Sequence, residues 1–330
     1  MNSSIIQDIV DKIRSSRKIV LTSHLRPDGD SLCTSLALSM MLQNMGKDVD
    51  IINFDNTPFP FIHFDDIDRI QIGTIPPDSY DLAILLECAN VARSGHDTLK
   101  NTPLINIDHH HSNDYYADIN WVEPEAPAVA CLAYTLSKAL NVPLTPEMAN
   151  HLYCGIVSDT GSFQFSNTNS QAFEVCFHLV KEGADPVAVS SRLFHNNPPE
   201  KILLLGRVLS SLRLNEKGNI AVISMFKKDL DSLHLQKEIE TEDINTQVRS
   251  IKDVEMVLFF KEMKPDIFRV SLRSRGNANS AMVAEFFGGG GHIHAAGFTA
   301  EGPFNQLIQD IPKTVEKLIQ KNRQAEPSNK

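Results

Sequence analysis

Residues 102–111 read Thr-Pro-Leu-Ile-Asn-Ile-Asp-His-His-His, so that Asp108 is followed by three histidines, His109–His111. The pattern of residues 104–107 predicts a short buried strand, with the carboxylate and the imidazoles at its end. Packing and solubility do not require this combination, whereas carboxylate and neutral imidazole groups are common ligands of divalent metal ions. The stretch therefore predicts a metal site, provided that other parts of the chain bring ligands to the same place.

Other strands in the first part of the chain end in the same kinds of residue. Residues 18–23 predict a strand that runs into a turn containing Pro and Gly, followed by an apolar helix over 32–45. A second strand is predicted over 49–54, and a buried strand over 80–87 ends in Glu87. This order of strand, helix and strand favours an α/β fold, with an open parallel sheet and helices on both faces.

The candidate ligands all follow predicted strands or interrupt a predicted helix. They are His24, Asp28, Asp30, Glu87, His109 and Asp159. Because ligands bind at the carboxyl ends of the strands in open parallel sheets, we expect these side chains to meet at one edge. Taken singly, Asp28 and Asp30 could lie in an ordinary surface turn, and Asp159 could simply cap a helix.

Together these ligand types predict a dinuclear centre. Two ions about 3.5–4 Å apart would share a bridging hydroxide that acts as the nucleophile. Mixed carboxylate and imidazole ligands suit Mn²⁺ better than Zn²⁺, which favours Cys and His.

A boundary is predicted at Asn196-Asn-Pro-Pro199, because the pattern of the chain changes after it. We therefore expect a catalytic domain over 1–194, a linker over 195–200 and a smaller α/β domain over 201–330, placed across a cleft. The second domain is expected to contain strands at 219–225, 254–260, 267–273 and 293–299.

The second domain also carries a cluster of possible phosphate-binding groups. Arg273 and Arg275 flank Ser274 at the end of a predicted strand, and residues 288–291 are four consecutive glycines followed by His292. A glycine loop exposes backbone N–H groups and can surround an anion closely. A flexible linker is the alternative interpretation of these glycines.

Composition excludes several classes of protein. The formal net charge of −10 argues against binding to long duplex nucleic acid, which depends on many Lys and Arg contacts, but permits a small phosphate ligand. No apolar run reaches the roughly 18 residues of a membrane span, and the first residues lack the pattern of a signal peptide. The five cysteines form no Cys-x-x-Cys pair, which predicts buried free thiols and a cytoplasmic location.

Four motifs in order make the chain resemble the DHH phosphoesterases that carry a DHH-associated C-terminal domain, and within them the nanoRNase/pAp phosphatase branch. The motifs are Ser-His-Leu-Arg-Pro-Asp-Gly-Asp-Ser from Ser23, Ala-Ile-Leu-Leu-Glu-Cys-Ala-Asn-Val-Ala-Arg-Ser-Gly from Ala83, Ile-Asp-His-His-His-Ser-Asn from Ile107 and Gly-Ile-Val-Ser-Asp-Thr-Gly-Ser-Phe from Gly155. A Gly-Gly-Gly-His-x-x-Ala-Ala-Gly signature follows from Gly289.

The resemblance implies a role for each residue of the first domain. One metal ion would be held by His24, Asp28 and Glu87, and the other by Asp30, Glu87, His109 and Asp159. The resemblance also implies that His110 and Arg93 face the phosphate, and that Asp108 orients the neighbouring histidines. The second motif of the family usually has Asp where this chain has Glu87, which leaves the metal spacing open.

In the second domain, the resemblance implies that a group of residues binds the phosphates of a nucleotide. These residues are Arg273, Ser274, Arg275, Gly290, Gly291 and His292. The implied substrates are short RNA oligonucleotides, dinucleotides and 3′-phosphoadenosine 5′-phosphate (pAp), and a homodimer is compatible with the family.

The leading hypothesis is therefore hydrolysis of phosphodiesters in very short RNA and of the 3′-phosphate of pAp. A phosphodiesterase for pApA or cyclic dinucleotides is one alternative. A catalytically weak nucleotide-binding regulator is another, and Glu87 is the feature that suggests it.

Overall fold

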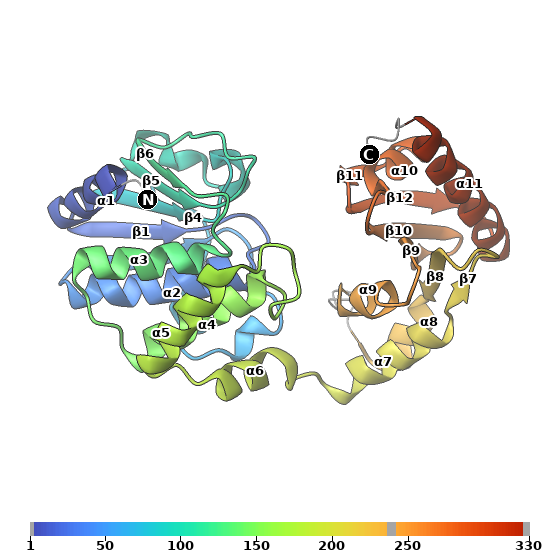
Figure 1. The fold of residues 1–330 in the computed structure, drawn as a ribbon, viewed down its shortest axis with the longest axis horizontal. Coiled ribbons are helices and arrows are strands. Elements are labelled where there is room, and N and C mark those ends of the chain that lie inside the picture. The colour runs from blue at the N-terminus through green and yellow to red at the C-terminus, as the bar shows by residue number, and fades with distance from the viewer. Residues whose placement is uncertain (1–2, 236–241, 326–330) are drawn as a thin grey trace. The chain divides into compact units, whose positions relative to one another are not determined.

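The computed structural model describes residues 3–235 and 242–325 (Figure 1). The chain divides into two compact units, residues 1–196 and 197–330. The division falls in the short stretch between helix α6 (Pro186–Phe194) and helix α7 (Pro199–Ser210). Prolines begin both helices, where their fixed φ angle is favourable and their missing N–H is not needed.

The first unit is built on a parallel sheet with strand order β3-β2-β1-β4-β5-β6. This confirms the predicted open parallel α/β fold. The strands are β1 (Lys18–Thr22), β2 (Asp48–Asn53), β3 (Ile70–Ile72), β4 (Leu82–Leu86), β5 (Leu104–Asp108) and β6 (Ile119–Val122). Because the strands are parallel, the residues that follow β1, β4 and β5 lie at one edge of the sheet.

Alternating side chains of these strands face two different cores. Ile19 and Leu21 of β1 pack in the larger core with the α-helices, whereas Val20 points to the opposite face, where a short 3₁₀ helix η4 (Asp97–Asn101) and loops cover it. The α-helices of the unit are α1 (Ser3–Ser15), α2 (Gly29–Asn44), α3 (Val129–Leu140), α4 (Pro146–Asp159), α5 (Ser170–Lys181) and α6. Helix α2 is buried along most of its length, as its apolar sequence predicts.

Some elements are short and have no clear pattern in the sequence. Residues 56–77 contain the 3₁₀ helices η1 (Phe61–His63) and η2 (Ile67–Arg69), followed by the edge strand β3. A third 3₁₀ helix, η3 (Val91–Ser94), follows β4. Elements of three or four residues are too short to show a hydrophobic period, so neighbouring strands and helices determine them.

The second unit contains a mixed sheet with strand order β11-β12-β10-β9-β8-β7. Strands β8 and β9 run parallel, and the other neighbours run antiparallel. The strands are β7 (Arg213–Leu214), β8 (Ile220–Met225), β9 (Met256–Lys264), β10 (Ile267–Ser274), β11 (Gly290–His292) and β12 (Ala295–Glu301). The helices are α7, α8 (Lys227–Asp231), α9 (Glu242–Arg249), α10 (Ser280–Phe286) and α11 (Phe304–Ala325). Two cores form, one against α10 and α11 and one against α7 and α9.

The glycine-rich stretch is a hairpin and not an open loop, which corrects the sequence expectation. Gly290, Gly291 and His292 form β11 and pair with β12. A Cβ atom at Gly289 would lie 2.2 Å from the carbonyl oxygen of Gly297, and one at Gly291 would lie 2.5 Å from Cα of Ala296. The glycines therefore allow the close approach of two backbones, a requirement that the composition of the stretch alone does not distinguish from flexibility.

Two further predictions concern the chain as a whole. The five cysteines are buried free thiols, as predicted. None of the helices within residues 3–235 and 242–325 is long and apolar enough to cross a membrane.

Candidate metal centre and active site

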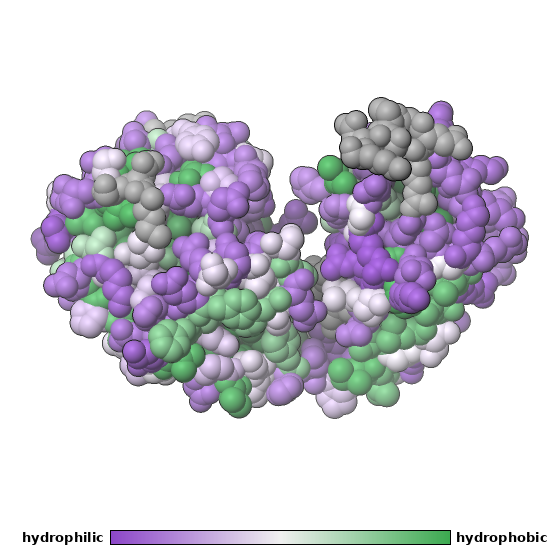
Figure 2. All heavy atoms as spheres, in the orientation of Figure 1, coloured by the Kyte–Doolittle hydropathy of each residue, from purple (hydrophilic) through white to green (hydrophobic). Residues whose placement is uncertain are grey.

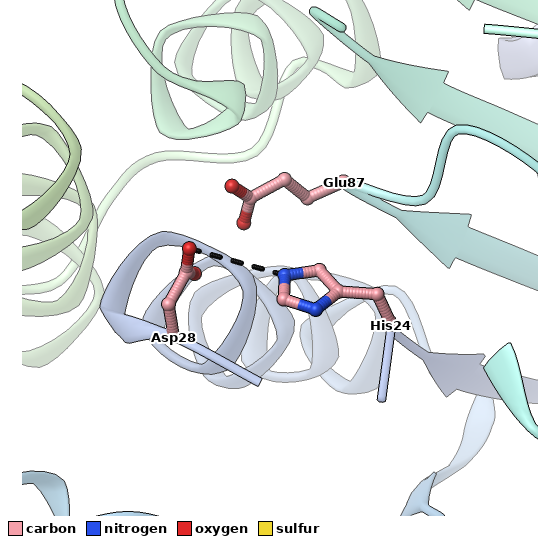
Figure 3. Close-up of side chains that lie close together, drawn as sticks. All are labelled: His24, Asp28 and Glu87. Atoms are coloured by element: carbon pink, nitrogen blue, oxygen red, sulfur yellow. Dashed lines mark ion pairs between the residues drawn. The ribbon is translucent and has the colours of Figure 1, made fainter. Parts of the chain in front are cut away.

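Three side chains from two strand ends and a helix start converge at the edge of the first sheet (Figure 3). His24 follows β1, and Asp28 is the N-cap of α2, where one carboxylate oxygen accepts a hydrogen bond from the backbone N–H of Ser31 at 3.1 Å. The other oxygen of Asp28 lies 3.8 Å from Nε2 of His24. Glu87 follows β4, and its carboxylate points into the same space.

The two histidines of the cluster are held in one orientation by backbone carbonyl groups. Nδ1 of His24 lies 2.8 Å from the carbonyl oxygen of Leu25, and Nδ1 of His109 lies 2.9 Å from that of Ala126. A carbonyl oxygen only accepts hydrogen bonds, so each Nδ1 carries the proton. Each Nε2 is then left with a lone pair directed at the carboxylates, which is the tautomer that a metal ligand requires.

Asp30 is fully buried and connects two helices. Its carboxylate accepts hydrogen bonds from the backbone N–H groups of Val129 and Ala130, at the start of α3, and from the hydroxyl group of Thr34. The positive end of α3 thereby compensates part of its charge. Asp30 thus has a structural role as well as its predicted role as a ligand, and its replacement would disturb the packing of α3 against α2.

Glu87 combines two unusual features. Its backbone φ angle is 54°, a left-handed conformation that is uncommon for Glu, and its side chain is only 2% exposed. Within the described residues, Oε2 of Glu87 is buried without a hydrogen-bond partner. A buried carboxylate oxygen with no donor is energetically unfavourable, and a bound cation would supply the missing partner.

Glu87 belongs to both groups of potential metal ligands that the described part of the chain contains. One group is His24, Asp28 and Glu87, and the other is Asp30, Glu87 and His109. Within each group, one ligand atom from every residue lies within 4.8 Å of the others. Asp159, at the end of α4, places Oδ2 3.6 Å from Nε2 of His109 and so stands beside the second group.

The pKa shifts in this cluster show an excess of negative charge. Burial, followed by repulsion from Asp28 and Asp30, raises the pKa of Glu87 well above its usual value. Burial and the charge of Asp159 raise the pKa of Asp30 to about 7, and burial raises the pKa of Asp159 to about 6. Burial lowers the pKa of His109, but the carboxylates of Asp30 and Asp159 outweigh it and raise that pKa overall. The cluster therefore favours protons or metal cations.

Asp108 has a different environment, although it also is fully buried. One of its oxygens accepts a hydrogen bond from Nδ1 of His110 at 2.7 Å and one from the backbone N–H of His109 at 2.8 Å. The other oxygen accepts from the side-chain amide of Asn113. Burial raises the pKa of Asp108, but these hydrogen bonds outweigh it and lower the pKa overall. Asp108 thus orients His110 and lies outside both ligand groups.

A polar pocket of about 530 Å³ opens beside the second group of ligands. All three histidines of the Asp-His-His-His stretch line it, including His111, for which the sequence alone suggests no role. Its other lining residues are Pro124, Glu125, Ala126, Asp159, Ser166, Asn167 and Asn169.

Two asparagines support this site, and the sequence alone does not assign them a role. The amide of Asn167 donates a hydrogen bond to Oδ2 of Asp159 at 3.0 Å, and Asn113 bonds Asp108. Both lie within or close after the motifs quoted above, so their position in a motif is the only signal in the sequence. Arg93 lies exposed in η3, and its backbone carbonyl accepts a hydrogen bond from Leu25 N–H at 2.6 Å.

In the second unit, the predicted substrate residues range from buried Ser274 through half-buried Arg273 to exposed Arg275 and β11. Ser274 is buried, and its hydroxyl group donates to the carbonyl oxygen of Ala278 at 2.6 Å, which holds the loop between β10 and α10. Arg275 is exposed, with one guanidinium nitrogen 3.1 Å from the carbonyl oxygen of Ile251. The strand β11, which includes Gly290, Gly291 and His292, is exposed.

Comparison with known families agrees with this arrangement. Residues 18–156 match the N-terminal domain of the DHH family, and residues 217–321 match the DHHA1 domain. The first unit therefore contains a DHH N-terminal domain and the second a DHHA1 domain, and these domains support a phosphoesterase function of the hydrolase class.

Curated relatives and solved structures extend the match over most of the chain. The bifunctional oligoribonuclease and PAP phosphatase NrnA of Thermus thermophilus is 27% identical over 306 residues, covering 93% of this chain and 89% of the relative. The protein of the same name from Bacillus subtilis is 28% identical over 288 residues, covering 84% and 88%. The crystal structure of an exopolyphosphatase-related protein from Bacteroides fragilis has the same fold, with a TM-score of 0.86, 24% identity and coverage of 97% and 98%.

Proposed function

We propose that this protein is a metal-dependent phosphoesterase that hydrolyses very short RNA oligonucleotides and removes the 3′-phosphate of pAp. The observation that carries the proposal is Glu87, whose buried carboxylate lies in both ligand groups and has an oxygen without a hydrogen-bond donor. The names of the two relatives, which match 93% and 84% of this chain, support the choice of substrates.

The residues present fit two divalent cations. His24, Asp28 and Glu87 would hold one, and Asp30, Glu87, His109 and Asp159 the other, because each histidine directs an Nε2 lone pair at the carboxylates. Mixed oxygen and imidazole ligands favour Mn²⁺ over Zn²⁺. Such ions would supply positive charge that activates a water molecule and stabilises the negative charge of the reacting phosphate.

The side chains around the cations would bind and orient the substrate. His110, whose Nδ1 donates to Asp108, lines the pocket beside the second ligand group, where it would contact a phosphate oxygen. Arg93 is an exposed cation that would contact the same phosphate. Arg273, Arg275, Gly290, Gly291 and His292 would bind the other phosphate groups of a nucleotide, and Ser274 would hold the loop that carries Arg275.

The proposal is tested by measuring product release from pAp and from a 5′-phosphorylated RNA dinucleotide in the presence of Mn²⁺, Mg²⁺ or EDTA. Turnover of both substrates with a divalent cation, and none with EDTA, is the expected result. Turnover of the dinucleotide alone would favour a dinucleotide phosphodiesterase. Calorimetric binding of pAp without any turnover would indicate a nucleotide-binding regulator and would overturn the proposal.

A further inference from the structure

A pocket on the second unit has no role in the chemistry described so far. Its volume is about 240 Å³, and it lies where strands β10 and β12 run side by side. Figure 2 shows mostly hydrophilic residues over this part of the unit. Its walls include Arg269, Thr299 and three glycines, Gly288, Gly289 and Gly297. None of these five residues belongs to the group to which the family resemblance assigns the phosphates of a nucleotide.

Arg269 is exposed on the outer face of β10. Phe268, Val270 and Leu272 of the same strand pack in the core against α10 and α11. Because side chains alternate between the two faces of a strand, Arg269 and Arg273 both point to the opposite face. Four residues of a strand span about 14 Å, so the two arginines stand on one face at about that separation along β10.

The charge of Arg269 is not compensated within the described residues. In residues 3–235 and 242–325, no carboxylate forms an ion pair with it, and neither its guanidinium group nor the hydroxyl group of Thr299 has a hydrogen-bond partner. Thr299 lies directly opposite Arg269 on β12, and Lys261 lies directly opposite it on β9. Like charges that face each other across two strands repel, and an anion bound beside them would offset this repulsion.

The glycines leave room for a ligand beside these groups. Gly297 lies on the same face of β12 as Thr299 and has no side chain to cover the neighbouring strand. At Gly288, whose φ angle is 76°, a Cβ atom would meet open space. The N–H groups of Gly288 and Gly289 are already bound to carbonyl groups of α10, at 3.0 and 2.8 Å. The donors for an anion would therefore be the side chains of Arg269 and Thr299.

We propose that this pocket, the Arg269 subsite, binds one phosphate group of an RNA oligonucleotide longer than a dinucleotide. A guanidinium group matches two oxygens of a phosphate, and the hydroxyl group of Thr299 can donate to a third. The two phosphates of pAp are carried by one ribose and are closer together than the roughly 14 Å between Arg269 and Arg273, so only a longer ligand reaches both arginines. The inference rests on the proposed function, because it extends the same class of substrate.

Binding measured without turnover tests the subsite. Calorimetry in EDTA compares a 5′-phosphorylated RNA tetranucleotide with pAp, and the parent protein should bind the tetranucleotide more tightly. Arg269→Ala should weaken tetranucleotide binding about tenfold and leave pAp binding unchanged. Arg213→Ala is the matched control, because Arg213 is exposed on β7 at the other edge of the sheet and its loss changes the net charge equally.

Three results of this measurement would overturn the proposal. The first is a parent protein that binds the tetranucleotide no more tightly than pAp. The second is tetranucleotide binding that Arg269→Ala does not weaken. The third is an equal loss for both ligands, or an equal loss in Arg269→Ala and Arg213→Ala, because either would indicate a general effect of charge.

The dependence of binding on salt tests for a direct phosphate contact. For single strands, each phosphate contact contributes about 0.7 to the slope of log Kd against log salt concentration. Arg269→Ala should lower the slope for the tetranucleotide by about 0.7. Arg269→Lys should keep the slope, because the charge remains, but should lose part of the affinity together with the planar guanidinium group. A slope that is the same in Arg269→Ala and the parent protein would contradict the contact.

These results can be separated from those of the activity test. Turnover of pAp with a divalent cation, together with tetranucleotide binding that does not depend on Arg269, would overturn the subsite alone. Tetranucleotide binding that depends on Arg269, with no turnover of any substrate, would overturn the proposed phosphoesterase function and leave the subsite in place.

Discussion

Glu87 of the first unit is predicted to bind metal and His292 of the second is predicted to bind substrate, and the two residues occupy opposite environments. Glu87 is buried beside Asp28 and Asp30, and these neighbours raise its pKa further. His292 lies exposed in β11, a short strand whose neighbouring glycines allow close backbone pairing. The first unit concentrates negative charge around buried carboxylates, whereas the second presents exposed groups on its surface.

This difference implies that residues of the two units affect different steps of the reaction. Buried charges are held in fixed positions and interact strongly, so a change among them should affect the rate of the chemical step. Exposed groups interact more weakly and should mainly affect the affinity for substrate. Four predictions test this comparison, from the largest expected effect to the smallest.

Asp28→Asn should give the largest loss. Asp28 is half-exposed, so the replacement removes a ligand charge without creating a cavity, and kcat/KM for pAp should fall about 1,000-fold or more. Circular dichroism should show an unchanged fold, and Asp68→Asn, at an aspartate of η2 outside both ligand groups, serves as the control. Activity within tenfold of the parent protein would contradict the assignment of Asp28 as a ligand.

Asp108→Asn should reduce kcat by about 10- to 100-fold, because it removes the carboxylate that orients His110. The KM for pAp should change much less. The emission of Trp121, the single Trp of the chain and a buried residue of β6, reports whether the first unit remains folded. A loss confined to KM would show that Asp108 acts on substrate binding instead.

His292→Ala should raise the KM for pAp by about tenfold and leave kcat nearly unchanged, because it removes one exposed hydrogen-bonding group. The KM for bis-p-nitrophenyl phosphate, which lacks further phosphates, should not change. His234→Ala, at another exposed histidine of the second unit, is the control. Equal losses with both substrates would indicate that His292 supports the hairpin and does not contact the nucleotide.

Glu87→Gln should raise the melting temperature of the metal-free protein by a few degrees. Because the pKa of Glu87 is higher in the folded than in the unfolded state, its ionisation destabilises the fold increasingly as pH rises above the usual range of a glutamate. The amide removes this charge, and Trp121 fluorescence follows unfolding of the first unit.

The same experiment with Mn²⁺ sharpens the comparison. The parent protein should gain about 2.7 kcal/mol when the free ion is at 100 times its dissociation constant, and Glu87→Gln should gain less. A metal-free Glu87→Gln protein that melts below the parent would show that the buried charge is already compensated.

Residue types and the order of predicted strands along the chain are enough to predict that His24, Glu87 and Asp108 lie at one edge of the sheet. The apolar runs before His24, Glu87 and Asp108 predicted parallel strands, and parallel strands end at one edge of their sheet. The pairing of β11 with β12 could not be predicted in this way. Consecutive glycines are found both in flexible linkers and where two backbones approach closely, so the sequence does not distinguish the two. Residues 56–77 have no clear pattern in the sequence, because their short elements depend on the sheet beside them.

The sequence by itself therefore determined the class of fold, the chemical type of the candidate ligands and the edge of the sheet at which these side chains meet, because periodicity and turn residues act over a few positions. Only the tertiary structure decided that Oε2 of Glu87 is buried without a hydrogen-bond partner among the described residues, that backbone carbonyl groups select the tautomers of His24 and His109, and that Asp30 also binds the start of α3. These features depend on contacts between residues far apart in the chain, which exist only once the core has packed.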